Sequence, residues 1–201
     1  MQVIDIEQNT PEWQEARKGK IGGSRAKDII SKRGGRKIGF YEIIAERLAQ
    51  EPTDEDPRER GHRLEEEAAK LFEQEYGVEL EQVGMWVSDD NSSLYISPDR
   101  AVRDDPTTAV EIKCYKTAFH LMAYIEQKLP SIFHEQAMQY FVVNKELERV
   151  YFAFHDDRIP TLPFFTIEIN RYEHEADIEY QENYLKNALN DIDEIVAKLA
   201  F

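Results

Sequence analysis

The segment Val110–Cys114 carries an acid and a base two residues apart in an otherwise apolar stretch. Because side chains alternate along an extended strand, Glu111 and Lys113 would share one face while the apolar side chains face the core. The same alternation in the segment Leu94–Asp99 would place Asp99 on one face with the serine two residues before it. The turn between the two segments is short, so the strands should pair and bring Asp99, Glu111 and Lys113 together.

Two neighbouring carboxylates repel each other unless a cation lies between them. Oxygen ligands suit Mg²⁺, which keeps water and phosphate oxygens as its other ligands. Asp99 and Glu111 are therefore candidate metal ligands, together with the backbone carbonyl of Ile112. Lys113 could orient or deprotonate an attacking water, or stabilise the charge that develops on a phosphate. Glu-x-Lys is a common pattern, so the alternative is a cross-strand salt bridge, which would contribute about 0.2–1 kcal/mol to stability. The preceding Ser-Pro-Asp favours the metal site.

Two further polar residues lie on the apolar faces of predicted helices. Glu65 lies at the apolar edge of a helix predicted over residues 62–76, where it could face a metal through water. Otherwise it is a first-turn acid that interacts with the helix dipole. Gln136 lies in the middle of the buried face of a helix predicted over residues 131–143, alongside Ile132 and Tyr140. A buried amide needs hydrogen-bond partners, and these could be a substrate phosphate, the attacking water or a backbone group.

The chain has 201 residues and a formal net charge of −15. This charge argues against a nucleic-acid partner, because phosphate binding requires Lys and Arg. The charge is uneven, however: the segment Arg17–Lys37 contains nine Lys or Arg residues and a single acid, Asp28. Such a basic block on an acidic body is either a phosphate-binding face or a solvated charged surface.

The composition excludes several other classes of protein. The hydrophobic fraction of 41% is typical of a globular chain. The single cysteine, Cys114, cannot form an internal disulfide; we expect it in the core of a cytoplasmic protein. We expect no signal peptide, and no segment approaches the roughly 20 apolar residues of a membrane span. The five histidines are scattered without zinc-site spacing, and there is no P-loop or nucleophile elbow.

The predicted elements form one mixed α/β domain with a central sheet covered by helices on both faces. The first helix is expected to have Thr10 as its N-cap and Pro11 as its first residue, and the second is expected to be capped by Ser24. Further helices are predicted over 40–50, 62–76 and 131–143, with a long helix, continuous or broken, at the end of the chain. Strands are predicted over 78–87, 94–103, 109–114, 149–154 and 163–169, and an exposed loop over 51–59.

Together these residues resemble a known nuclease motif. Ser97-Pro98-Asp99 followed by Glu111-Ile112-Lys113 is similar to the motif of the PD-(D/E)XK nuclease superfamily. More closely, the chain resembles the phage λ exonuclease type, the YqaJ viral recombinase family, over nearly its whole length. The supporting matches are the W-x-x-x-R-x-G-x-I-x-x-S segment (Trp13, Arg17, Gly19, Ile21, Ser24), the G-x-x-x-E helix (Gly61, Glu65), the E-I-K-C strand (111–114), the first Gln of a Q-x-Q helix (Gln136) and the segment 151–154.

The resemblance implies a restriction-endonuclease-like core and a Mg²⁺-dependent 5′-to-3′ exonuclease. Such an enzyme degrades one strand of duplex DNA and leaves 3′ single-strand overhangs for phage-type recombination. The resemblance also implies a homotrimeric ring around the DNA, a single-strand annealing protein as partner, a bacterial host cell, and two Mg²⁺ ions for which Mn²⁺ can substitute. In such a single nuclease domain over 1–201, residues 1–60 would be the helical DNA-contacting part, 61–155 the catalytic core and 156–201 a C-terminal strand and helix.

The resemblance assigns roles to individual residues. Asp99 and Glu111 would hold Mg²⁺, Glu65 would assist through water, and Lys113 would activate the nucleophile. The residues expected near the 5′-phosphate or the cleaved phosphate are Arg17, Ser24, Ser97 and Gln136.

Three positions depart from the family pattern. Arg100 replaces the usual Gly after Ser-Pro-Asp, Tyr115 replaces a frequent Pro after the Lys-Cys pair, and Met138 replaces the second Gln of Q-x-Q. Two other functions remain open. One is a structure-specific or restriction-like DNA endonuclease of the same superfamily. The other is a non-enzymatic acidic interaction domain, such as a DNA mimic.

Overall fold

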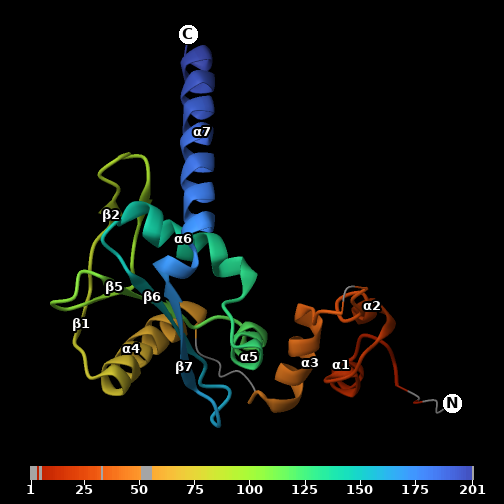
Figure 1. The fold of residues 1–201 in the computed structure, drawn as a ribbon. Coiled ribbons are helices and arrows are strands. Elements are labelled where there is room, and N and C mark those ends of the chain that lie inside the picture. The colour runs from red at the N-terminus through yellow and green to blue at the C-terminus, as the bar shows by residue number, and fades with distance from the viewer. Residues whose placement is uncertain (1–3, 5, 33, 51–55, 201) are drawn as a thin grey trace.

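A five-stranded mixed sheet forms the centre of the molecule (Figure 1). The structure is a computed structural model and describes residues 4, 6–32, 34–50 and 56–200. The strand order is β1-β4-β5-β6-β7, in which only β5 and β6 are parallel neighbours. Their bounds are β1 Leu80–Glu81, β4 Arg100–Val102, β5 Thr108–Lys113, β6 Arg149–His155 and β7 Phe164–Asn170, and a separate ribbon pairs β2 Trp86–Val87 with β3 Tyr95–Ile96.

Helices pack on both faces of this sheet, which confirms the predicted mixed α/β class. On one face, α4 (Pro57–Tyr76) buries Ala68, Ala69 and Phe72 against β5 and β6. On the other face, α6 (His134–Val143) and α7 (Glu175–Leu199) pack over Phe152 and its neighbours. Full burial of a side chain such as Phe152 contributes about 1.5–3 kcal/mol to the stability of the fold. Residues of β5 belong to both clusters, so the strand is packed from both faces.

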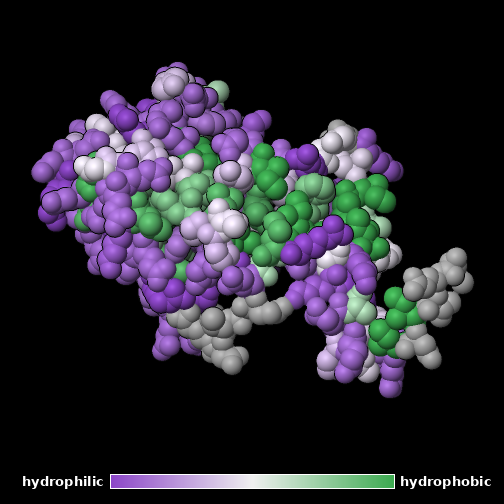
Figure 2. Space-filling view, turned by 90° about the horizontal axis from the view of Figure 1, so that it is seen from below, coloured by the Kyte–Doolittle hydropathy of each residue, from purple (hydrophilic) through white to green (hydrophobic). Residues whose placement is uncertain are grey.

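The remaining helices extend the molecule on one side. α5 (Thr117–Glu126) packs against α3 (Ile38–Leu48), and α3 connects to α1 (Pro11–Arg17) and α2 (Gly23–Ala26). Short 3₁₀ turns, η1 (Ser131–Phe133) and η2 (Arg171–Glu173), precede α6 and α7. The N-terminal helices project away from the sheet (Figure 1), and the space-filling view from below shows this part of the chain as a lobe at the right of the molecule (Figure 2). None of the described helices combines the length and the apolar character that crossing a membrane requires.

Local sequence explains where the first helices begin and end. Thr10 accepts a hydrogen bond from Trp13 N at 3.2 Å, which confirms it as the N-cap of α1. Gly19 follows α1 with a φ of +66°, a conformation that L side chains rarely adopt. The predicted cap of α2 was wrong: Gly22 is its N-cap, and Ser24 lies inside the helix without capping it.

Several predicted boundaries also differ from the structure. The segments 78–87 and 94–103, each predicted as one strand, are both divided into two short strands that belong to different sheets. Pro98, which has no backbone N–H to donate, interrupts the second segment. Helix α4 already begins at Pro57, so the predicted loop over 51–59 is shorter, although its residues 51–55 lie outside the described part. The last helix is continuous.

Candidate active site

The register of β4 and β5 brings two predicted acids together. Arg100 pairs with Val110 in this antiparallel ladder, so Asp99, one residue before β4, lies opposite Glu111. The Asp99 Oδ2 atom accepts a hydrogen bond from the backbone N of Ile112 at 2.7 Å. The main chain of β5 therefore fixes the Asp99 carboxylate beside Glu111, as the alternation of side chains predicted.

Glu111 lies at the centre of a hydrogen-bonded cluster. It is only 5% exposed, and its Oε1 atom accepts hydrogen bonds from Lys113 Nζ at 2.7 Å and from Gln136 Nε2 at 2.7 Å. Its Oε2 atom accepts a hydrogen bond from the Tyr140 hydroxyl. Gln136 Oε1 in turn accepts a hydrogen bond from Lys113 Nζ at 2.9 Å, which closes a ring of three side chains. These donors offset the cost of burying the Glu111 carboxylate.

The surroundings of Asp99 disfavour its ionised form. Burial, followed by the nearby negative charge of Glu111, raises the pKa of the Asp99 carboxyl from 3.8 to about 6. Burial and Glu111 also raise the pKa of the Tyr140 hydroxyl, so Tyr140 acts as a donor to Glu111. Directly after β5, burial raises the pKa of the Cys114 thiol to about 12. This partly buried thiol packs against the cluster under α4, as expected for a structural cysteine.

The donor set fits Mg²⁺ better than zinc. In the residues that the structure describes, no group of three or more His, Cys, Asp or Glu side chains is arranged to hold a metal ion. Asp99 and Glu111 supply carboxylate oxygens only, and no described residue donates a hydrogen bond to the Oδ1 atom of Asp99. Mg²⁺ is usually held by one or two carboxylates, with water and phosphate oxygens completing its coordination. A divalent cation here would also relieve the repulsion that raises the Asp99 pKa.

Glu65 and Ser97 lie near the cluster without joining it. The Glu65 side chain on α4 is 42% exposed, and its Oε2 atom lies 3.9 Å from His62 Nδ1. Its charge contributes to the raised pKa of Asp99 and Cys114, so Glu65 faces the same region of the sheet. Ser97 is exposed between β3 and β4, two residues before Asp99. Both positions are compatible with contact to the site through water or substrate.

Arg17 and Ser24 are not brought to this cluster. They lie exposed on α1 and α2, which project away from the sheet (Figure 1). The Arg17 guanidinium stacks over the Trp13 ring at 4.0 Å. Arg17 also lines a hollow of about 380 Å³ together with Lys18, Lys20, Arg25 and other residues. The hollow thus gathers four Lys or Arg side chains of the basic block, and Glu46 also contributes to its lining.

Acidic residues neutralise part of the basic block. Arg25 forms ion pairs with Glu46 at 2.7 Å and with Glu42 at 3.5 Å, and Arg36 pairs with Glu126 at 3.0 Å. The excess positive charge available to a phosphate is therefore smaller than the sequence count indicates.

Sequence reasoning missed two residues of the site. Tyr140 was recognised only as part of an apolar helix face, although it lies four residues after Gln136 and therefore on the same side of α6. Its buried hydroxyl required a partner, which is a signal that could have identified it. Arg100, seen only as a departure from the family pattern, is buried and donates to the Asp99 carbonyl at 2.7 Å and to Glu66 Oε1 at 2.5 Å. It thereby ties the Asp99 main chain to α4.

Comparison with known proteins agrees with this geometry. Residues 12–145 match the YqaJ-like viral recombinase domain, a range that includes all the predicted site residues. No curated protein matches the chain. The chain is similar to the crystal structure of an alkaline exonuclease (LHK-Exo) from Laribacter hongkongensis, with 28% identity and a TM-score of 0.60 over 95% of this chain and 98% of that one. The same exonuclease in complex with dAMP matches with 27% identity and a TM-score of 0.60, over 95% of this chain and 98% of that one.

The match extends over almost the full length of both chains, and the central sheet with its flanking helices is the PD-(D/E)XK core. The family match covers the N-terminal helices, α4, the Asp99–Lys113 strands and the Gln136 helix together. The chain therefore belongs to the YqaJ-like viral recombinase family.

Proposed function

We propose that this protein is a Mg²⁺-dependent 5′-to-3′ double-strand DNA exonuclease that leaves 3′ single-strand overhangs for phage-type recombination. Its family and its similarity to an alkaline exonuclease support a deoxyribonuclease that acts as an exonuclease. The observation that carries the proposal is the contact of Lys113 Nζ with Glu111 Oε1 at 2.7 Å, beside the half-buried carboxylate of Asp99. An acid pair and a lysine on adjoining strands form a hydrolytic site for a phosphodiester.

Each side chain of the cluster has a distinct task in this mechanism. Asp99, Glu111 and the carbonyl of Ile112 would hold Mg²⁺, which supplies positive charge to the phosphate and lowers the pKa of water. Lys113, with its Nζ atom already bonded to Glu111 and Gln136, orients the attacking water and stabilises the developing phosphate charge.

The surrounding residues keep the reacting groups in place. Tyr140 and Gln136 both donate to Glu111, so its carboxylate keeps one orientation. Glu65 reaches the site through water from α4. Fixing these groups before substrate binds reduces the reorganisation needed in the transition state.

The DNA end is received by other residues. Arg17 and Ser24 bind the 5′-phosphate from the N-terminal helices, and Ser97 contacts the cleaved phosphate beside Asp99. A homotrimeric ring would let the basic N-terminal segments line a channel while the acidic body faces outward. The resulting overhang would be passed to a single-strand annealing protein in the cytoplasm of a bacterial host.

Digestion of labelled linear duplex tests this proposal. With Mg²⁺, label at the 5′ end should be released early and label at the 3′ end should persist. A chelator should stop the release of the 5′ label. Closed circular plasmid should remain intact, because the enzyme requires an end. Cleavage of the circle would instead identify an endonuclease of the same superfamily. Absence of any Mg²⁺-dependent nucleotide release would favour an acidic interaction domain.

A further inference from the structure

Tyr115 lies directly beyond the strand that carries Lys113. Cys114 packs against the cluster under α4, so the alternation of side chains continues past the end of β5 and places Tyr115 on the Lys113 face. Ring contacts agree with this placement: the Tyr115 ring lies 5.4 Å from Phe119 and 6.1 Å from Phe133. Phe133 belongs to the buried cluster on the α6 side of the sheet, and Lys113 Nζ lies over its ring.

The Phe133 ring connects Tyr115 with the reacting groups. Its centroid is 6.1 Å from the Tyr115 ring and 4.9 Å from Lys113 Nζ. Phe133 is buried at 8% exposure, whereas Tyr115 is 49% exposed. Tyr115 therefore presents an aromatic surface to solvent, and the Phe133 ring lies between it and the lysine of the active site.

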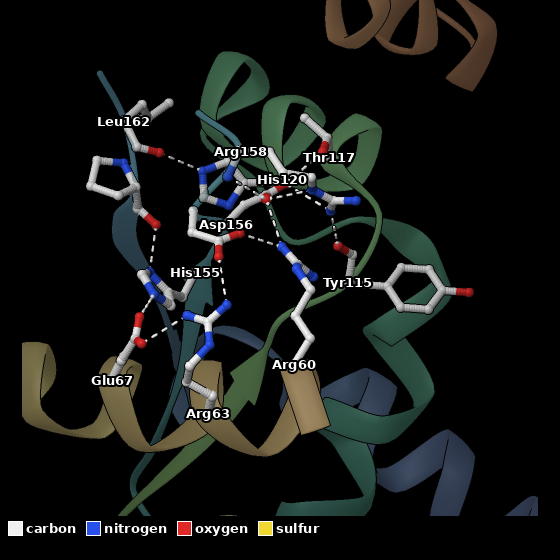
Figure 3. Close-up of polar contacts among 12 residues, drawn as sticks. Arg60, Arg63, Glu67, Tyr115, Thr117, His120, His155, Asp156, Arg158 and Leu162 are labelled. Carbon is white, nitrogen blue, oxygen red and sulfur yellow. Dashed lines mark hydrogen bonds and ion pairs between the residues drawn. The ribbon is translucent and has the colours of Figure 1, made fainter. Parts of the chain in front are cut away.

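An ion network around the buried Asp156 holds the main chain of Tyr115 (Figure 3). Arg158 Nη2 donates to the Tyr115 carbonyl at 3.0 Å, and the same guanidinium donates to Asp156 at 2.8 Å and 3.0 Å. Asp156 is only 1% exposed and also accepts hydrogen bonds from Thr117 at 2.6 Å and from Arg60 at 3.2 Å.

In Figure 3 the Tyr115 carbonyl points into this network while its ring points away from it. The hydrogen bond from Arg158 thus holds the main chain of Tyr115, while its ring is exposed to solvent on the other side. A surface whose position is fixed before binding loses little conformational entropy when a ligand stacks on it.

We propose that the Tyr115 ring is a stacking platform for a nucleobase of the DNA beside the phosphodiester that is cleaved. Aromatic side chains bind bases by stacking without sequence preference, because every base has a π-face. This suits an enzyme that degrades any sequence, so the inference rests on the proposed exonuclease function. The family often has proline at the position of Tyr115, and proline has no aromatic ring on which a base could stack.

The test compares Tyr115→Ala, Tyr115→Phe and the wild type. We measure kcat and KM for release of the first nucleotide from a short duplex with Mg²⁺. A parallel duplex carries abasic nucleotides on either side of the first scissile bond. Tyr172→Ala is the matched control, because this tyrosine is 71% exposed and lies on η2 rather than at the end of β5.

We expect Tyr115→Ala to raise KM roughly 5- to 150-fold on the intact duplex, which corresponds to the loss of one stacked base, with kcat changed far less. Tyr115→Phe and Tyr172→Ala should match the wild type. On the abasic duplex, Tyr115→Ala and wild type should behave alike. An unchanged KM for Tyr115→Ala, or an equal penalty on the abasic duplex, would overturn the platform. If the wild type releases no nucleotides, the exonuclease function itself fails; if only the Tyr115 effect is absent, that function stands.

Discussion

Replacing Asp99 with asparagine should make the metal-free protein more stable at neutral pH while abolishing DNA cleavage. The amide side chain cannot ionise, so it removes the charge that burial and Glu111 disfavour. Its oxygen can still accept the hydrogen bond that Ile112 N donates to Asp99 at 2.7 Å. The same charge that destabilises the metal-free protein is the charge that Mg²⁺ requires.

The raised pKa of Asp99 sets the size of this effect. Because the pKa in the folded protein is about 6 and the ordinary value is 3.8, the folded state binds the proton more tightly than the unfolded state. The stabilisation from the protonated carboxyl is complete below pH 3.8 and is lost as pH rises through about 6. At about 1.36 kcal/mol per pH unit, ionised Asp99 then costs up to about 3 kcal/mol. At pH values above about 6, we expect the free energy of unfolding of Asp99→Asn to exceed that of the wild type by about 1–3 kcal/mol.

Urea unfolding in a chelator, followed from acidic to mildly alkaline pH, measures this difference. The free energy of unfolding of Asp99→Asn should exceed that of wild type above the pKa of about 6 and approach it towards pH 3.8. Added Mg²⁺ should narrow the gap, because it stabilises only the protein that binds it. Asp105→Asn is the control: Thr107 lowers the pKa of Asp105, so this change should not stabilise. An Asp99→Asn protein that is less stable at every pH would refute the reasoning.

Three further substitutions and one chemical modification test the site. Lys113→Ala should slow nucleotide release by about 100-fold or more while DNA binding in a gel-shift assay persists; wild-type rates would exclude its catalytic role. Tyr140→Phe removes the hydroxyl that donates to Glu111 Oε2 and should lower the cleavage rate by about 10- to 100-fold; an unchanged rate would show that this contact does not position the carboxylate. Arg17→Ala should reduce the ratio of rates on 5′-phosphorylated and 5′-hydroxyl ends; a constant ratio would reject phosphate binding there. The Cys114 thiol, with a pKa raised to about 12, should resist iodoacetamide in the folded protein and react after unfolding, and rapid native alkylation would contradict its placement.

Local patterns were sufficient to predict the core of the site. The alternation of Glu111 and Lys113 with apolar residues places both on one face of their strand. A short turn joins this strand to the one that ends in Asp99, so the two strands pair with each other. Gln136 was predicted as a buried amide, and the structure shows that its partners are Glu111 and Lys113 rather than the backbone.

Other features depend on contacts between distant parts of the chain. Ile132 was predicted to be buried by helical periodicity, but it lies in the 3₁₀ turn before α6 and is 52% exposed. Arg100 acquires its role only when α4 brings Glu66 within 2.5 Å of it. The basic block loses part of its free charge to Glu46 and Glu126, which lie elsewhere in the sequence. Such partners cannot be identified from periodicity alone.

Anomalous diffraction from crystals grown with Mn²⁺ in place of Mg²⁺ would test most directly whether one divalent site unites these residues. The expected result is an anomalous peak at coordination distance, about 2.0–2.3 Å, from carboxylate oxygens of both Asp99 and Glu111, and its absence in Asp99→Asn crystals. A peak that involves neither carboxylate, or no peak at saturating Mn²⁺, would contradict the metal-dependent hydrolytic site.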